Sequence, residues 1–174
     1  NFAHPGEKDY TYIDINKALD DTITICRNEW KYFAQVITDY DPDLPYVSCA
    51  KDEVNQVFLN IIVNSAQAIG ESSSSDGNEM GTITVSTSYN KEEVVITISD
   101  TGPGIPEHIR DRIFNPFFTT KEVGKGSGQG LYIAHDIIVE RHNGVLNFQS
   151  EMGKGTTFTI KLPLDSRQTS HLPG

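Results

Sequence analysis

The sequence predicts an α+β fold, a two-layer sandwich in which about three helices cover one face of a mixed, mainly antiparallel sheet. First, apolar residues recur every three or four positions in segments 14–30, 52–69 and 129–141, which is the period of helices packed on a core. Second, most strand-like segments come in pairs joined by short turns, which favours antiparallel pairing. A doubly wound parallel sheet would instead alternate strands with helices, so we expect one helical layer on one sheet.

The size and charge of the chain limit its class. Its 174 residues fit one domain, and 37% hydrophobic residues can build a core. With 24 acidic and 14 basic residues the formal net charge is -10, which repels a phosphate backbone, so nucleic acid is not an expected partner. A site for one triphosphate needs no basic patch, because backbone N–H groups and a metal ion can balance the charge.

The predicted elements follow one another along the whole chain. In order they are a strand at 10–14, a helix at 14–30, strands at 32–40 and 46–49, a helix at 52–69, strands at 82–89 and 94–100, a short helix at 106–113, a helix at 129–141, and strands at 145–150 and 156–162. The strand 94–100 is apolar on both faces and is therefore expected at the centre of the sheet. We expect residues 1–10 to form a boundary segment, 11–163 the domain, and 164–174 a disordered tail.

The cysteines and the absence of long apolar runs indicate the cellular compartment in which the domain is expected. Cys26 and Cys49 have no CxxC spacing and are expected to be free thiols in a reducing compartment. No apolar run approaches the roughly 20 residues of a spanning helix, and no signal peptide is recognisable, so we expect a cytoplasmic domain without direct membrane contact. The sequence leaves open whether a parent protein is membrane-anchored.

A narrow polar stripe runs along the apolar helix 52–69. At about 100° per residue, five side chains fall within an arc of roughly 80°. They are Glu53, Gln56, Asn60, Asn64 and Gln67. Two interpretations remain open: a polar network inside the core, or carbonyl oxygens of Asn60 and Asn64 offered to a hard cation such as Mg²⁺.

A carboxylate and two glycines end the predicted central strand. Asp100 at the end of a buried strand is costly unless a group donates to it, and the exocyclic amine of a purine is a suitable donor. Gly102 and Gly104 allow a ligand to approach the backbone closely. An ordinary Asp-Gly turn is the alternative.

A second glycine-rich segment, 124–130, leads into the helix predicted at 129–141. Clustered N–H groups before a helix favour anions, which predicts a phosphate site; a flexible linker is the alternative. A Walker A loop is excluded because Lys125 is followed by Gly126 rather than Ser or Thr. Phe117 lies in an aromatic pair that suits either the core or an anchor for a mobile loop, with Lys121 and Lys125 within reach of phosphate.

The order of these motifs resembles a known family. Asn60-x-x-x-Asn64-Ser65-Ala66-x-Ala68, Asp100-x-Gly102-x-Gly104-Ile105, Phe114-Asn115-Pro116-Phe117-Phe118, Gly126-x-Gly128-x-Gly130-Leu131 and Gly155-Thr156-Thr157-Phe158 resemble the N, G1, F, G2 and G3 boxes of sensor histidine kinases. The resemblance covers about residues 11–163 and is nearest to the nitrogen-regulation type. It implies the Bergerat ATP-binding fold, with ATP and Mg²⁺ as cofactors. Ser65 stands where alanine is common, a small change.

The resemblance also implies roles for individual residues. Asp100 accepts a hydrogen bond from the adenine amine with Thr156 assisting through water, Asn64 is the magnesium ligand, and Asn60 lies beside it at the catalytic position. The implied nucleotide contacts are Asn60, Asn64, Gln67, Asp100, Gly102, Gly104, Ile105, Phe117, Lys121, Lys125, Gly126, Ser127, Gly128, Gly130, Leu131 and Thr156.

The residue at position 60 bears on the type of enzyme. Hydrolytic relatives carry a glutamate there that activates water, whereas Asn60 cannot take a proton near neutral pH. The resemblance therefore implies a histidine kinase whose γ-phosphoryl group passes to a histidine on a dimerisation domain, with a response regulator downstream. No histidine here, including His4, has the context of an acceptor helix. A regulatory nucleotide-binding module without phosphotransfer and an ATP-hydrolysing clamp remain as alternatives.

Overall fold

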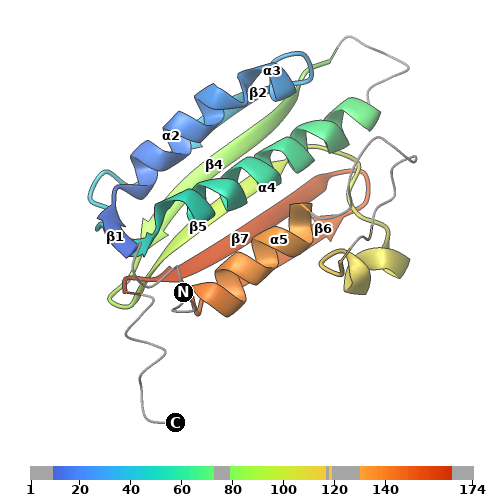
Figure 1. Ribbon diagram of the computed structural model, residues 1–174. Helices are drawn as coiled ribbons and strands as arrows, with labels where there is room; N and C mark the ends of the chain where they lie inside the picture. The colour runs from blue at the N-terminus through green and yellow to red at the C-terminus, as the bar shows by residue number, and fades with distance from the viewer. Residues whose placement is uncertain (1–9, 73–78, 117, 119–129, 166–174) are drawn as a thin grey trace.

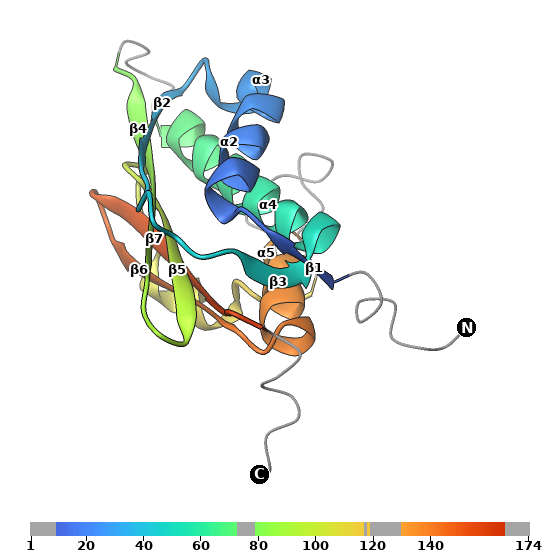
Figure 2. The same cartoon turned by 90° about the vertical axis from the view of Figure 1, so that its left-hand side faces the viewer.

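The computed structural model describes residues 10–72, 79–116, 118 and 130–165. Helices lie side by side over one face of a five-stranded sheet, as Figure 1 shows. Seen edge-on in Figure 2, the sheet forms one layer and the helices the other. The predicted two-layer α+β fold is confirmed.

The sheet has the order β2-β4-β5-β7-β6. Its strands are β2 (Ala34–Asp39), β4 (Gly81–Tyr89), β5 (Glu93–Asp100), β6 (Val145–Glu151) and β7 (Gly155–Pro163). Only the β2–β4 pair is parallel, and the other three pairs are antiparallel. The strand predicted to be central is β5, with alternate residues Val94, Ile96 and Ile98 fully buried, so the sheet is mixed and mainly antiparallel as expected.

The first predicted helix, 14–30, is two helices. α2 (Ile15–Ile25) is capped by Cys26, and α3 (Arg27–Trp30) begins at the next residue. The Trp30 indole Nε1 donates to the Ile23 carbonyl at 2.9 Å, which links α3 to the last turn of α2. The period of apolar residues continues across the break, which is why the sequence did not reveal it.

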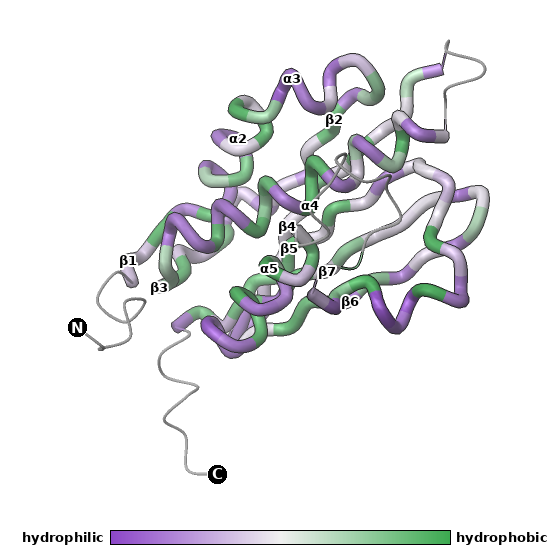
Figure 3. Tube along the Cα trace, turned by 45° about the vertical axis from the view of Figure 1, so that its right-hand side comes forward, coloured by the Kyte–Doolittle hydropathy of each residue, from purple (hydrophilic) through white to green (hydrophobic). Residues whose placement is uncertain are grey.

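Helix α4 (Lys51–Ser72) is longer than predicted and continues through Gly70, where an end at position 69 was expected. A Cβ at Gly70 would lie 2.9 Å from the Phe33 ring. The glycine therefore allows an aromatic ring to pack closely and does not terminate the helix. Figure 3 shows hydrophobic and hydrophilic residues alternating along α4, in keeping with its position between core and solvent.

The later helical segments differ from regular α-helices. The short helix predicted at 106–113 is a 3-10 helix, η1 (Glu107–Arg112). The helix predicted at 129–141 is α-helical as α5 (Gly130–His135) and continues as a π-helical turn, η2 (Asp136–Arg141). Immediately after it, His142 Nδ1 lies 3.0 Å from the Ile137 carbonyl, five residues earlier.

A small second sheet pairs β1 (Tyr10–Ile13) antiparallel with β3 (Val47–Ala50). The two segments predicted around the Asp41-Pro42 turn therefore lie in different sheets. Leu164, assigned to the tail by sequence, accepts a hydrogen bond from Ser48 N at 2.9 Å, and Asp165 forms a bridge with Ser48. Leu164 and Asp165 are thus part of the fold, and the rest of the predicted tail lies outside the described residues.

Candidate functional site

Asp100 lies at the carboxyl end of the central strand and is 6% exposed. Its neighbours in register are Ile83 on β4 and Thr156 on β7. The Asp100 Oδ1 atom accepts a hydrogen bond from the Gly102 N–H at 2.8 Å. The central strand and its two partners therefore fix the position of this acid.

The protonation of Asp100 depends on opposing effects. Burial raises the pKa of its carboxyl above the ordinary value, because water no longer stabilises the charge. The Gly102 N–H, the Ser65 hydroxyl and the Thr156 backbone lower the pKa by stabilising the carboxylate. No basic side chain forms an ion pair with Asp100 within the described ranges, so its charge depends on these dipoles and on any ligand.

The glycines after Asp100 are required by contacts within the protein. Gly102 is buried, and a Cβ there would lie 3.0 Å from Asp100 Oδ1 and 3.3 Å from the Ala68 Cβ on α4. Gly104 has φ +88, and a Cβ there would lie 2.6 Å from the Glu151 carbonyl. The loop is therefore pressed between α4 and the β6–β7 hairpin, in addition to any approach of a ligand.

Ser150 connects that loop to β7 and was not singled out from the sequence. Its Oγ accepts from the Ile105 N–H at 2.7 Å and lies 2.9 Å from the Thr156 Oγ1. It also donates to the Gly155 carbonyl at 3.2 Å. One hydroxyl thus joins Ile105 and Thr156, both predicted site residues. The sequence contained one signal for Ser150, because the last predicted hairpin pairs this residue with Thr156.

Part of the polar stripe on α4 is a hydrogen-bonded network. Gln56 Nε2 donates to Asn60 Oδ1 at 2.6 Å, and Asn60 Nδ2 donates to the Gly130 carbonyl at 3.0 Å. Asn60 therefore ties α4 to the start of α5. The first residue of the stripe, Glu53, forms an ion pair with Arg141.

Asn64 differs from its neighbours on the stripe. Its side chain is half-buried and makes no hydrogen bond to any residue that the structure describes. Its amide oxygen is thus available to a hard cation, the ligand chemistry that Mg²⁺ prefers. The described ranges hold no group of three or more His, Cys, Asp or Glu that could form a metal site alone, so a cation here would need phosphate and water oxygens as well.

The structure places the predicted site residues in two groups joined by α4. Asp100, Gly102, Gly104, Ile105 and Thr156 lie around the end of β5, whereas Gly130 and Leu131 begin α5. Asn60, Asn64 and Gln67 lie on α4, which contacts Gly102 through Ala68 and Gly130 through Asn60. Phe117, Lys121, Lys125, Gly126, Ser127 and Gly128 lie outside the described residues.

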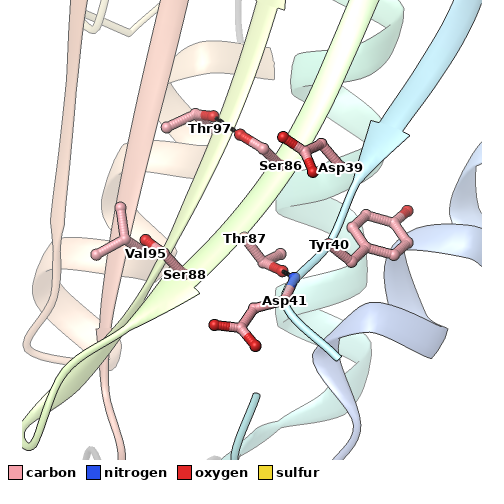
Figure 4. A pocket seen from close by; sticks show the side chains of 8 residues that line it. All are labelled: Asp39, Tyr40, Asp41, Ser86, Thr87, Ser88, Val95 and Thr97. Carbon is pink, nitrogen blue, oxygen red and sulfur yellow. Dashed lines mark hydrogen bonds between the residues drawn. The ribbon is translucent and has the colours of Figure 1, made fainter. Parts of the chain in front are cut away.

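A pocket of about 360 Å³ lies elsewhere, at the opposite end of β5 (Figure 4). It is lined by Asp39, Tyr40, Asp41, Ser86, Thr87, Ser88, Val95 and Thr97. Ser86 and Thr97 hydrogen-bond to each other across β4 and β5, and they alternate with the buried Val85, Ile96 and Ile98. They therefore face away from the helices, and this pocket is separate from the Asp100 site.

The state of the two cysteines agrees with the sequence analysis. Cys26 and Cys49 are free, as predicted, and both are buried. Burial raises the pKa of their thiols to about 11 and about 12, so neither is a thiolate near neutral pH. Among the described residues, no helix combines the length and the apolarity needed to cross a membrane.

Comparison with known proteins gives one consistent result. The family model for histidine kinase-, DNA gyrase B- and HSP90-like ATPases matches residues 49–166. The sensor histidine kinase ZraS of Escherichia coli (strain K12) is 40% identical over 122 residues, 70% of this chain and 24% of ZraS. The sensory histidine kinase/phosphatase NtrB of Escherichia coli O157:H7 is 33% identical over 157 residues, 86% of this chain and 43% of NtrB. The chain thus spans less than half the length of these relatives.

A solved structure extends this similarity to the fold. The nucleotide-free catalytic domain of histidine kinase ThkA has a TM-score of 0.76 and 25% identity, covering 90% of this chain and 98% of that domain. ThkA has also been solved in complex with the response regulator protein TrrA, with a TM-score of 0.74 to this chain at 23% identity. The resemblance inferred from the five sequence boxes is confirmed.

Proposed function

Because this chain belongs to the family of histidine kinase-, DNA gyrase B- and HSP90-like ATPases, we propose that it is the ATP-binding catalytic domain of a sensor histidine kinase. ATP would bind between α4 and the loop after β5. Its γ-phosphoryl group would pass to a histidine on a dimerisation domain, and from there to a response regulator. The observation that carries the proposal is Asp100, a buried acid without an ion-pair partner among the described residues.

The described residues support distinct parts of this activity. Asp100 would accept a hydrogen bond from the adenine amine, with Thr156 adjacent across the strand pair to hold a bridging water. Gly102 and Gly104 would let the base lie against the loop. Gly130 and Leu131 at the start of α5, together with the glycine-rich segment before them, would contact the phosphates.

The residues on α4 fit a magnesium ion that accompanies the triphosphate. Mg²⁺ would neutralise charge on the phosphate oxygens, and the side-chain amide of Asn64 would be its protein ligand. Asn60 would hold the beginning of α5 in place, since both ends of its amide are already hydrogen-bonded. Gln67 lies one turn beyond Asn64, toward the Asp100 loop.

The absence of a base at position 60 favours phosphotransfer over hydrolysis. An amide cannot activate water, and Glu53, the one carboxylate on the stripe, is paired with Arg141. A neutral imidazole already has a free lone pair and needs less activation than water does. Since this activity draws on cellular ATP, we place the domain in the cytoplasm.

Two measurements test the proposal. MgATP should bind to the isolated chain in titration calorimetry. Addition of a separate dimerisation-helix fragment from a related kinase such as NtrB should then give acid-labile, base-stable phosphohistidine on that fragment. Tight MgATP binding without transfer to any such fragment would instead favour a regulatory module. Steady phosphate release by the isolated chain would favour a hydrolytic clamp.

A further inference from the structure

Ser65 on α4 is a buried polar residue to which the roles above give no use. The residue is 0% exposed, and its Oγ has no hydrogen-bond partner within the described part of the chain. Leaving a buried hydroxyl without a partner is unfavourable, and alanine at this position would avoid that cost. A serine here therefore requires an explanation beyond packing.

The surroundings of Ser65 point to Asp100. Ser65 lies three residues before Ala68, on the same side of α4. Ala68 packs directly against Gly102, whose N–H is bonded to Asp100 Oδ1. The Ser65 Oγ has no hydrogen-bond partner among the described residues, and its hydroxyl lowers the pKa of the Asp100 carboxyl, which places an unused donor beside this acid.

We infer that Ser65 is a positioning residue of the nucleotide site, whose hydroxyl donates to the Asp100 carboxylate and keeps it a hydrogen-bond acceptor, thereby selecting purines with an amine at C6. The inference rests on the proposed function, because it concerns the same acid. Its new element is that base preference depends on a residue of α4 outside the predicted set of nucleotide contacts.

The chemistry of the two protonation states explains the preference. An ionised carboxylate only accepts hydrogen bonds, so it matches the C6 amine of adenine and repels the C6 carbonyl oxygen of hypoxanthine. A protonated carboxyl could donate to that carbonyl oxygen. Burial favours the protonated form, whereas the Gly102 N–H, the Ser65 O–H and the Thr156 backbone favour the ionised one. Removal of one of these donors should therefore weaken the discrimination.

The test compares MgATP with MgITP, which has a carbonyl oxygen at C6. Affinities are measured by titration calorimetry from pH 5.5 to 8 for wild type, Ser65→Ala and Ser65→Cys. We expect Ser65→Ala to weaken ATP binding about three- to tenfold near neutral pH, the equivalent of one hydrogen bond. The loss of ATP affinity on acidification should begin at higher pH in the variant, and the ATP-to-ITP preference should fall. Ser65→Cys, similar in size but a weak donor, should behave like Ser65→Ala.

Controls separate this role from folding and from the proposed function. Thermal unfolding of Ser65→Ala should occur close to the wild-type temperature, because one hydroxyl group is removed and the packing of α4 in the core is kept. Ser86→Ala, on the outer face of the sheet, should leave affinity, base preference and pH dependence unchanged. Equal weakening of ATP and ITP with an unchanged pH profile would indicate a purely structural role and overturn the inference.

The Asp100→Asn variant distinguishes failure of the inference about Ser65 from failure of the proposed function. If this variant loses ATP affinity while Ser65→Ala matches wild type in every measurement, the inference fails and the proposed function stands. If wild type itself does not bind MgATP, both fail together.

Discussion

Asp100 is a side chain whose proposed role in binding works against the stability of the free protein. It is a nearly buried acid, and dipoles rather than a cation stabilise it within the described ranges. Because its pKa is raised on folding, the folded state takes up this proton before the unfolded chain does as the pH falls from neutral. Its contribution to stability is therefore unfavourable at neutral pH and improves on acidification.

Replacement of Asp100 by asparagine should separate binding from stability. We expect MgATP affinity to fall by about 2 kcal/mol or more, since a buried acceptor becomes partly a donor. The nucleotide-free variant should unfold at the wild-type temperature or above it, because a buried charge is removed. Calorimetric titration and thermal unfolding measure the two effects, with the exposed Asp39→Asn as control. Unchanged ATP affinity in Asp100→Asn would refute the adenine assignment.

Asn64 has a more specific prediction, because its proposed ligand is a cation. Asn64→Ala should weaken ATP binding more in the presence of Mg²⁺ than in EDTA, because the Asn64 amide oxygen contributes to binding only when Mg²⁺ is present. Titrations under both conditions test this, and Asn147→Ala on the exposed edge strand β6 provides the control. Equal losses with and without the metal would remove Asn64 from the magnesium site.

Single residues also show how far the sequence could predict the site. Asn60, Asn64 and Asp100 could be predicted as site residues from the sequence. Asn60 and Asn64 lie on one face of a helix, and Asp100 lies at the end of a strand, and both positions follow from local sequence patterns. Ser150 and the environment of Ser65 could not be read in the same way. Their partners, Ile105 and the Asp100 loop, lie far away in sequence, and only the packing of β6, β7 and α4 brings them together.

At the level of elements, the β6–β7 hairpin carries two glycines of very different importance. Gly153 has φ +82, and no atom of the described residues lies within 4 Å of the place that a Cβ would take there. Gly155 has φ +138, and a Cβ there would overlap the Asp100 carbonyl oxygen. Gly153 is therefore needed only for its positive φ angle, whereas Gly155 also permits a close contact between β7 and β5.

Alanine substitutions at these two glycines should differ in cost. Gly153→Ala should cost about 1 kcal/mol of unfolding free energy, from backbone strain alone. Gly155→Ala should cost more than about 3 kcal/mol, because β7 must move away from β5. Urea denaturation measures both, and equal costs would contradict this account of the strand contact.

The elements that the sequence predicted best are those with an unbroken period, such as α4 and β5. The misplaced boundaries have local causes that periodicity does not detect. Gly70 accommodates the Phe33 ring instead of ending α4, and Cys26 separates α2 from α3 at a point where the apolar period continues. The separation of β2 and β3 into two sheets depends on distant partners, β4 and β1, and no local signal specifies it.

At the level of the whole molecule, His142 joins segments from both ends of the chain. It is fully buried, accepts a hydrogen bond from Ala50 N at 3.1 Å and stacks on Tyr10 with ring centroids 5.1 Å apart. Since Ala50 donates to Nε2, the proton of the neutral ring must lie on Nδ1, which donates to the Ile137 carbonyl. Protonation of Nε2 would break the bond to β3.

The contribution of His142 to stability should therefore fall in mild acid, opposite in sign to that of Asp100. Burial lowers the pKa of His142, an effect opposed by the Ile137 carbonyl and the charge of Glu53 and reinforced by Arg141. The unfolded chain binds this proton first, so the His142 contribution to the unfolding free energy should decrease as pH falls below about 6.5, down to the lowered pKa of His142. Urea denaturation across pH 5 to 8 should show that wild type and His108→Gln lose more stability on acidification, or gain less, than His142→Phe does. An identical pH dependence in His142→Phe would assign the wild-type slope to other groups.

Strand β3 has a consequence for how such a domain can be combined with others. Tyr10 pairs with Ala50 on one side of β3, and Asp165 pairs with Ser48, so the chain enters and leaves the fold two positions apart on the same strand. A unit with neighbouring entry and exit points can be inserted into a longer polypeptide, or circularly permuted through a short linker, without stretching its sheet. Under the proposed function, modularity of this kind would let one catalytic unit serve many different sensors.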